Sequence, residues 1–483
     1  MRRILLILIF FVGMLNAQQT KFFRTYGLGL FDVGECVVPV ADTNYIVAGT
    51  TNTTGMNGTD LLIFKTNSIG DLIWWKNFGG TGIESGKSVV MTADSSGYLV
   101  CGYKNDFTPS GYDVWLLKIN LNGDTVWTKT YGGNDWEVSY SINKLPDSTY
   151  IIAGETYSFG NGQRDAYILR IDSNGDTLWT KTFGGVNDDV VRYIHIDRHQ
   201  NILLVGNTES FGAGNSDAYL VYLDLNGDSI WTKTIGTADD DFGYSADMYI
   251  DTSGAMSFVV GYTSWYIPDL AQNTYLLRID SMGNSISLHP QYEASTVILD
   301  HPHVLQREPG KISLITNYKE AVDQNSILFL QKTQYNIVPI LERTCAGGVS
   351  ESTFQNDFKL SLDKGFIVTG YSENWGPGPT SCILLKLDTM MQSPDTPTVS
   401  IEKLNVGNID VFPNPVISEH FYINSSNAIE SVTILSLNGE LTHSFKIPVE
   451  QKSLALETPL IASGIYLLEI KTKEGTVYRK MIF

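Results

Sequence analysis

The segment GDTVWTKTYGG at residues 123–133 decides the fold, because the chain repeats it. A second block, DVWLLKIN at 113–120, precedes it, and a third, YLVCG at 98–102, comes before both. Copies of the first block follow one another at about 52 residues: GDLIWWKNFGG at 70–80, GDTLWTKTFGG at 175–185 and GDSIWTKTIGT at 227–237. A fixed period of this length is the signature of a repeat architecture.

Each block is a short run of β-branched, aromatic and leucine residues bounded by glycine, asparagine or aspartate, which is typical of a β-strand. No segment keeps a helical period. Asn122-Gly123, Asn174-Gly175 and Asn226-Gly227 separate the last two strands of their copies and favour a two-residue type I′ hairpin turn. The repeated unit is therefore a four-stranded antiparallel meander. In the first copy the predicted strands lie near 36–40, 45–49, 61–65 and 72–78.

One such meander cannot bury both of its faces, and stacking copies around an axis solves this problem. The second and third blocks occur seven times, so residues 18–389 are predicted to form an all-β, seven-bladed β-propeller of four-stranded blades. Six or eight blades and an open β-solenoid are the alternatives. The last copy ends at Asp388 without its fourth strand, but FFRTYG at 22–27 matches the end of that block. We therefore expect residues 22–27 to complete the last blade and close the ring.

A tryptophan recurs in the fourth strand of four copies, at Trp74, Trp127, Trp179 and Trp231. A ligand rarely needs the same aromatic residue in every blade, so we favour packing between blades over a stacking platform for sugars. The third copy also reads D-x-N-G-D from Asp172 to Asp176. This resembles the opening of a calcium loop, but the remaining ligands are missing, and no calcium site is predicted.

An acidic series precedes the first strand of six copies, at Asp32, Glu84, Glu137, Asp189, Asp241 and Glu351. First strands line the central channel of a propeller, so one interpretation is a ring of carboxylates that binds cations or a basic partner. The favoured interpretation is that each carboxylate accepts hydrogen bonds from the backbone of the neighbouring blade.

Catalytic signatures are missing from the sequence, which has no nucleophile elbow, no H-E-x-x-H, no phosphate loop and no dinucleotide fingerprint. We therefore predict no catalytic residue and no cofactor. Asp300, His301 and His303 in the sixth copy are suitable metal-ligand types, and so are His195 and His199. Neither group has a clear further ligand, and both are interpreted as incidental, so no metal site is predicted.

The composition narrows the classes of function. Of 483 residues, 43% are hydrophobic and 18% charged, which is enough apolar content to build a core and excludes a disordered chain. The formal charge of −19 repels phosphate backbones, so no nucleic-acid partner is expected. The four cysteines, Cys36, Cys101, Cys345 and Cys382, are too few for a disulfide scaffold in a chain this long, and no pairing is predicted.

The first 17 residues are predicted to be a secretory signal peptide. Arg2 and Arg3 precede an apolar run at 4–12, which is shorter than the roughly 20 residues that cross a bilayer. The small residue Ala17 predicts cleavage between Ala17 and Gln18; a buried N-terminal strand is the alternative. No later stretch approaches spanning length, so the mature chain is expected to lack a transmembrane segment.

A second domain follows the repeats. Residues 390–405 are rich in proline, serine and threonine and are predicted to be a linker. Residues 406–483 show shorter strands, which predict a small antiparallel β-sandwich. Four motifs stand out in it: VFPNP at 411–415, LNGE at 437–440, SGIYLLEI at 463–470 and RKMIF at 479–483.

These motifs resemble the type A C-terminal sorting domain of the type IX (Por) secretion system, with an ordinary immunoglobulin-like module as the alternative. The matching residues are Val411, Phe412, Pro413, Asn414 and Pro415 in the opening motif, Gly464, Ile465 and Tyr466 in the G-x-Y core, and the basic pair Arg479 and Lys480. The resemblance implies a Bacteroidota protein whose partner is the type IX secretion machinery. Members are commonly cleaved before this domain, then released or fixed to surface lipopolysaccharide. The repeats also look like propeller repeats of surface proteins in that group.

Two functions follow as hypotheses. The favoured one is a secreted or cell-surface propeller that binds or adheres without catalysis, its extracellular ligand unknown. The alternative is a secreted glycan- or peptide-degrading enzyme with its site on the divergent fifth and sixth blades. Residues 262–310 break the period there, and Trp265, Tyr266, His289 and His301 are the candidate residues.

Overall fold

The computed structural model describes two stretches of the chain. The first is residues 21–388 without 28, 30, 53–57, 106–110, 252, 267–270, 291–296, 310, 321–325, 335–337, 343–352 and 374–378. The second is residues 409–482 without 413–419, 436–440, 446, 448–450, 458, 460–464 and 473–474. The chain divides into two compact units, Met1–Val399 and Ser400–Phe483.

The N-terminal unit is built from antiparallel sheets of strands that follow one another in sequence, in agreement with the expected all-β meanders. The first sheet holds β2 (Asp32–Pro39), β3 (Tyr45–Thr51), β4 (Asp60–Thr66) and β5 (Leu72–Phe78). The second holds β6 (Ile83–Met91), β7 (Gly97–Asn105), β8 (Asp113–Asn120) and β9 (Thr125–Tyr131). The third holds β10 (Glu137–Lys144), β11 (Tyr150–Thr156), β12 (Asp165–Ile171) and β13 (Thr177–Phe183). The fourth holds β14 (Asp189–Ile196), β15 (Ile202–Thr208), β16 (Asp217–Leu223) and β17 (Ser229–Ile235).

The next eight strands are assigned to one sheet with two halves. The first half holds β18 (Asp240–Ile250), β19 (Met256–Tyr266), β20 (Ala271–Ile279) and β21 (Ser285–Pro290). The second half holds β22 (Val297–Glu308), β23 (Lys311–Glu320), β24 (Ser326–Gln334) and β25 (Val338–Glu342). A single parallel residue pair, Gln272 with Ile298, joins the halves.

The last sheet combines both ends of the unit. It holds β26 (Thr353–Leu360), β27 (Phe366–Ser372) and β28 (Ser381–Leu387), and its fourth strand is β1 (Phe22–Tyr26). β1 pairs antiparallel with β28 along its whole length. Within the described residues, the one departure from strands and turns is a 3-10 turn, η1 (Ala41–Thr43).

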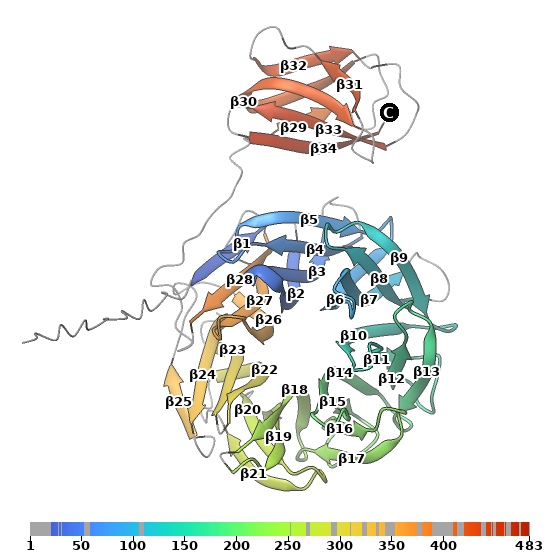
Figure 1. The fold of residues 1–483 in the computed structure, drawn as a ribbon, viewed down its shortest axis with the longest axis vertical. Coiled ribbons are helices and arrows are strands. Elements are labelled where there is room, and N and C mark those ends of the chain that lie inside the picture. The colour runs from blue at the N-terminus through green and yellow to red at the C-terminus, as the bar shows by residue number, and fades with distance from the viewer. Residues whose placement is uncertain are drawn as a thin grey trace, which may run out of the picture. The chain divides into compact units, whose positions relative to one another are not determined.

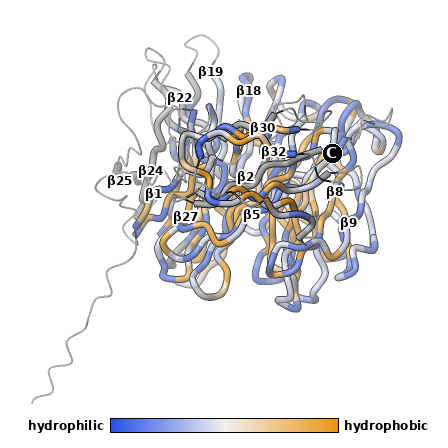
Figure 2. Tube along the Cα trace, turned by 90° about the horizontal axis from the view of Figure 1, so that it is seen from above, coloured by the Kyte–Doolittle hydropathy of each residue, from blue (hydrophilic) through white to orange (hydrophobic). Residues whose placement is uncertain are grey.

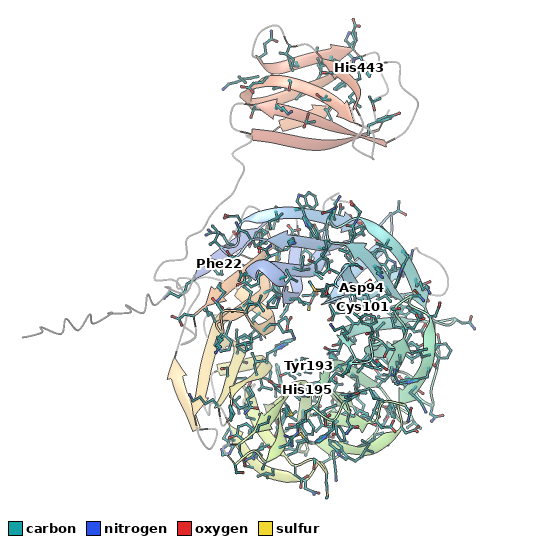
Figure 3. All side chains as sticks on the ribbon, viewed as in Figure 1. Phe22, Asp94, Cys101, Tyr193, His195 and His443 are labelled. Atoms are coloured by element: carbon teal, nitrogen blue, oxygen red, sulfur yellow. The ribbon has the colours of Figure 1, made fainter. Side chains whose placement is uncertain are left out.

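The sheets stand side by side around a common centre (Figure 1). The first strand of each group of four is innermost and contacts the first strand of the next, from β2 through β6, β10, β14, β18 and β22 to β26. β26 in turn contacts β2. The fourth strands lie at the periphery, where Figure 3 shows Phe22 of β1, while Tyr193 of β14 lies toward the centre. The first strands are therefore the elements that can line a central site.

The core lies between neighbouring sheets. Ile46 and Leu61 of the first sheet pack with Val89, Val100 and Leu117 of the second, and similar clusters bridge later sheets. Because both faces of the middle strands are covered, β3, β11 and β15 are buried at every residue. The outer strand β5 instead alternates between partly buried and exposed residues. Figure 2 shows the hydrophobic stretches along the strands and the hydrophilic ones at the turns.

The turns before the outer strands correct one prediction. A type I′ turn needs positive φ at both central residues, but in the 120–124 turn only Gly123 has it, with φ 84°. Gly123 N–H donates to the Asn120 carbonyl (3.1 Å), and Asn120 N–H donates to the Asp124 carbonyl (2.9 Å). These bonds define a type I turn that ends in a left-handed glycine, a three-residue loop with a β-bulge.

The side chain at the start of the turn explains the difference. Asn120 Oδ1 accepts the N–H of Asn122 (2.9 Å) and of Asp124 (3.0 Å), an Asx turn that favours right-handed φ at Asn122. Gly175 and Gly227 occupy the same turn position as Gly123 in the next two copies, and they also have positive φ, at 78° and 77°. The type I′ prediction is wrong, although the antiparallel pairing that it implied is present.

The C-terminal unit has its own sheet and its own core. Its strands are β29 (Ile409–Phe412), β30 (His420–Leu435), β31 (Leu441–Phe445), β32 (Gln451–Glu457), β33 (Ile465–Thr472) and β34 (Gly475–Ile482). The long β30 pairs through its first half with β29 and β32 and through its second half with β31 and β33, all antiparallel. Phe421, Ile423, Val432, Ile434 and Leu468 are buried together beneath these strands. No described helix in either unit is long and apolar enough to span a membrane.

Prediction for β1. Phe23 is 1% exposed and packs with Phe358, Phe366 and Ile383 of the last sheet. We expect Phe23→Ala to lower the free energy of unfolding of the mature protein by about 3–5 kcal/mol, because it leaves a cavity in this cluster. The control is Phe31→Ala, at a residue that is 43% exposed and is expected to cost less than about 1 kcal/mol. Urea titration measures both. Equal losses for the two variants would contradict a structural role for β1.

Candidate functional site

A β-bulge interrupts the first strand of every group of four. At this bulge the register between first and second strands skips one residue in six groups and two residues in the group that begins with β22. β22 has a second register shift further along, at Arg307. The residues skipped at the shared bulge are Glu35, Lys87, Tyr140, Arg192, Tyr244, His301 with Pro302, and Asn356. A bulged residue has no partner in the ladder, so its side chain can be re-aimed, and bulges concentrate near functional sites for this reason.

The bulges supply seven side chains to one central cavity of about 280 Å³. We call Glu35, Lys87, Tyr140, Arg192, Tyr244, His301 and Asn356 the bulge ring; all seven line the cavity. Residues that follow on the same strands complete the lining: Cys36, Ser88, Ser141, Tyr193, His303, Asp357 and Lys359. The volume suits a small molecule or the end of a longer one, since ligand pockets usually measure roughly 300–1,000 Å³.

Neighbours in the bulge ring interact across sheet boundaries. Lys87 Nζ lies 2.5 Å from Glu35 Oε1, and Asn356 Nδ2 donates to Glu35 Oε2 at 3.4 Å. The Arg192 guanidinium lies over the Tyr140 ring, 5.4 Å from its centroid. The rings of Tyr244 and His301 are 4.6 Å apart.

An inner layer of the cavity is also charged. Lys359 Nζ lies 3.2 Å from Asp357 Oδ1 and 5.8 Å from the centroid of the Tyr193 ring. The Tyr193 and His303 rings meet edge to face at 6.3 Å. Asp357 Oδ2 further accepts the backbone N–H of Val37 at 3.0 Å, which fixes this carboxylate against the first sheet.

Burial controls ionisation in the inner layer. Burial lowers the pKa of His303 to about 4, although the charge of Asp357 acts in the opposite direction. His303 is therefore neutral at neutral pH. Burial raises the pKa of Tyr193 to about 12. Burial disfavours the charged form of Lys359, but Asp357 together with Tyr193 and Cys36 more than offsets this effect, and the pKa of Lys359 lies above its usual range. The carboxyl pKa of Asp357 is lowered by Lys359 and His303 in spite of burial. Lys359 and Asp357 are therefore both charged.

The charges of the cavity do not cancel. Lys87, Arg192 and Lys359 are cationic, while Glu35 and Asp357 are anionic, which leaves one surplus positive charge. Lys87 and Lys359 each have a carboxylate partner. Arg192 has none among the residues that the structure describes. A surplus cation inside a protein of formal charge −19 marks the cavity as distinct from the rest of the molecule.

The acidic series lies outside this cavity. Asp32, Glu84, Glu137, Asp189 and Asp241 are 0–2% exposed, and they accept hydrogen bonds in the connections that lead from one sheet to the next. Glu137 is representative: Oε2 accepts the Gly133 N–H (2.7 Å) and Oε1 accepts the Thr156 hydroxyl (2.6 Å). Carboxylates held in this way are not presented to a ligand in the cavity. Glu351 lies outside the described residues.

The recurring tryptophans rest on turn glycines of the next sheet. A Cβ atom on Gly123, Gly175, Gly227 or Gly283 would lie 2.8–3.2 Å from ring atoms of Trp74, Trp127, Trp179 or Trp231, respectively. We call this contact the outer clamp. A lysine two residues later adds an ion pair to the same turn, as in Lys129 Nζ to Asp176 Oδ1 at 2.6 Å. Phe22 of β1 occupies the tryptophan position against Gly70, with 2.8 Å to such a Cβ.

The other candidate residues are dispersed. Asp172 Oδ1 of the calcium-like turn accepts the N–H of Asn174 and of Asp176, both at 2.8 Å. His195 lies beside Asp247, with Nδ1 3.4 Å from Oδ1, and His199 is exposed in the following turn. No group of three or more histidine, cysteine, aspartate or glutamate side chains in the described parts of the chain could hold a metal ion.

The residues of the enzyme hypothesis do not form one site. Trp265 and Tyr266 end β19, His289 lies on the fourth strand β21, and His301 lies in the central cavity. Among the described side chains of this set, only His301, with its neighbour His303, reaches the cavity. The side chain of Tyr266 lies outside the described residues. The side chain of Asp300 lies outside the described residues.

The cysteines that the structure describes, Cys36, Cys101 and Cys382, are free and buried. Burial raises the pKa of all three thiols, to about 12 for Cys101, so they remain protonated at neutral pH. Cys345 lies outside the described residues.

Sequence reasoning missed the bulge ring, although a signal was present. Five of its members follow the acidic residue of their copy by three positions: Glu35, Lys87, Tyr140, Arg192 and Tyr244. The residue type changes in nearly every copy there, while the strand blocks around it repeat. A position that varies inside a fixed repeat is free from the demands of the scaffold and can serve a ligand.

The motif residues of the second unit are placed only in part. Val411 and Phe412 end β29, Ile465 and Tyr466 begin β33, and Arg479 and Lys480 lie on β34. Pro413, Asn414, Pro415 and Gly464 lie outside the described residues, as do the turn at 437–440 and the predicted signal-cleavage residues Ala17 and Gln18. Residues 410–483 match the family model described as "Secretion system C-terminal sorting domain". The tail of this chain belongs to that sorting family.

Three proteins that resemble this chain share little of its sequence. Regulatory protein FlaEY of Caulobacter vibrioides is 23% identical over 154 residues, which cover 27% of this chain and 16% of that protein. PorZ of Porphyromonas gingivalis, a bacterial surface component of the type IX secretion system, has a TM-score of 0.41 at 12% identity, covering 92% of this chain and 58% of PorZ. A Pyrococcus horikoshii acylaminoacyl peptidase has a TM-score of 0.43 at 10% identity, covering 82% and 58%. The chain thus spans little more than half of these two structures, and the function of the N-terminal unit is argued from its own residues.

Prediction for the outer clamp. Gly175 has φ 78°, and an added Cβ would lie 2.8 Å from Trp127; Gly254 has φ 86° with nothing within 4 Å. Alanine meets the same left-handed strain at both positions, about 1–2 kcal/mol. We expect Gly175→Ala to lower the free energy of unfolding by about 1–3 kcal/mol more than Gly254→Ala, because only the first displaces a packed ring. Chemical denaturation compares them. Equal losses would mean that the tryptophan contact does not hold the sheets together.

Proposed function

We propose that this protein is an exported β-propeller that binds a small extracellular ligand in its central cavity without transforming it. The observation that carries the proposal is the bulge ring: seven side chains of six residue types converge on one cavity from a position whose residue type varies between the copies. Residues that pack between sheets recur in each copy because the packing is the same. Residues that contact a ligand differ between copies, because a ligand has different chemical groups on its different sides.

We further propose seven blades and a closed ring. Three observations support this. The first strands contact one another in an unbroken cycle that returns from β26 to β2. The eight-stranded sheet has two four-stranded halves joined by one residue pair. The outer clamp also recurs at the junction of the chain's ends, where Phe22 rests on Gly70 and the Tyr26 hydroxyl donates to the Gly70 carbonyl at 2.6 Å.

The sorting tail supports export. A tail of this family implies a secreted or cell-surface location. In the proposed arrangement a signal peptide at 1–17 takes the chain across the inner membrane, and the type IX machinery carries it onward. A linker at 390–405 separates the propeller from the sorting domain at 406–483. Attachment to surface lipopolysaccharide after sorting is part of the same proposal.

The state of the charged groups favours binding over catalysis. Glu35 forms an ion pair with Lys87, and Asp357 forms one with Lys359, which lowers the pKa of Asp357. A general acid needs a carboxyl group that keeps its proton near neutral pH, and the lowered pKa of Asp357 disfavours that form. What the cavity presents instead is charge, hydroxyl groups and aromatic edges. If the protein is an enzyme, His301 and His303 are the candidate catalytic groups. The glycan-array experiment below distinguishes this alternative by looking for cleavage.

Prediction for ligand binding. On a glycan array, we expect the mature protein to bind at least one class of sugar and to release no product. Asn356→Trp fills the cavity from a partly buried bulge position, so it should weaken that binding by about tenfold or more. The control is Asn134→Trp, which adds the same ring at an exposed loop residue and should leave binding unchanged. Equal binding by both variants would contradict a cavity site, and cleavage of a spotted glycan would support the enzyme.

Prediction for export. We expect deletion of residues 406–483 to leave the protein in the periplasm, because the truncated chain no longer presents the sorting tail. Cell fractionation with an antibody against the propeller measures its location. A carrier protein fused between residues 1–20 and residues 400–483 is the reciprocal control and should reach the cell surface or the medium. Normal surface export of the truncated chain would refute the assignment of the tail.

A further inference from the structure

The Arg192 side chain is the outstanding feature of the bulge ring. It is a partly buried cation whose carboxylate partner is missing from the described residues, whereas Lys87 and Lys359 are both paired. A buried cation normally has an anionic partner, because removing it from water is costly. Within the described part of the chain, no carboxylate neutralises Arg192.

The guanidinium is held in place by neutral groups. Its Nη1 donates to Asn207 Oδ1 on β15 at 2.5 Å, and its plane lies over the Tyr140 ring, with 5.4 Å from Cζ to the centroid. Asn207 is fixed in turn, because its Nδ2 donates to the Ser216 hydroxyl at 3.4 Å. These contacts orient Arg192 without neutralising it, so less freedom is lost when a ligand binds.

The donors that remain suit an oxyanion. Guanidinium has five N–H groups, and one of them is used by a described residue. The fork of two parallel N–H groups matches carboxylate, phosphate and sulfate oxygens, which a lysine cannot match in the same bidentate way. The Tyr140 and Tyr244 phenols, Ser141 and Asn356 line the same cavity and give it polar walls, which suit a hydroxylated skeleton.

We infer that the cavity takes an anionic sugar unit, with its acid group on Arg192. This inference rests on the proposed function and names the ligand class of the same site. A volume of about 280 Å³ is large enough for one sugar residue with its acid group, either free or at the end of a chain. Carboxylate and phosphate share the chemistry that Arg192 recognises, and the experiment separates them.

The test uses the mature protein and three probes: D-glucuronate, D-glucose 6-phosphate and D-glucose. Isothermal titration calorimetry measures each dissociation constant. We expect at least one acid to bind about tenfold or more tighter than glucose, because only an acid pairs with the guanidinium. Tighter binding of glucuronate would identify a uronic acid, and tighter binding of the phosphate a phosphorylated sugar. Arg192→Gln should abolish the difference between acid and glucose, and Arg192→Lys should restore only part of it.

Arg198→Gln is the matched control, since Arg198 is exposed in the turn after β14 and does not line the cavity. It should leave all three dissociation constants unchanged, and thermal melting establishes that each variant is folded. Equal affinity for acid and glucose, unchanged acid binding by Arg192→Gln, or no binding of either acid would overturn the inference. Binding of any neutral glycan that Asn356→Trp abolishes would still leave the proposed function standing, so the two failures are distinguishable.

Discussion

In the N-terminal unit, the described middle strands carry apolar side chains on both faces along most of their length, and neither face can remain in water. β3, β11 and β15 have no exposed residue, and core clusters of the N-terminal unit draw on two neighbouring sheets. A single four-stranded sheet would leave these faces open, so each sheet needs a neighbour on both sides. When the sheets are arranged around a common centre, each sheet can bury its middle strands with the same sequence pattern. The repetition of the sequence is the direct consequence.

The same constraint explains which positions are free to change. The strand blocks are fixed by packing, the turn glycines by the rings of the outer clamp, and the acidic series by hydrogen bonds in the connections between sheets. The bulged residue of each first strand is the exception. It has no partner in the ladder and lines the cavity, so pairing with the second strand does not limit its identity. Glutamate, lysine, tyrosine, arginine, histidine and asparagine all occur there.

The four-stranded unit could be predicted from the sequence because local patterns set it. Apolar runs, their spacing and the bounding glycines were sufficient to identify the strands, and FFRTYG at 22–27 identified the fourth strand of the last sheet. The turn type could not be read from Asn122-Gly123 alone, because the Asn120 side chain selects a different geometry. The cavity was missed for a deeper reason. A bulge is a shift in register between two strands, and one strand's sequence does not contain it.

The charge of the cavity and the charge of the molecule act over different distances. A formal charge of −19 spread over the chain creates a field that repels anions, but physiological salt screens that field beyond about 8 Å. Arg192 lies partly buried against Tyr140, where water and ions screen it much less. Once a ligand reaches the cavity, the local cation therefore outweighs the distant carboxylates. An acidic exterior then discourages adsorption of polyanions such as nucleic acid, and under the inferred binding mode the cavity would still take a single small acid group.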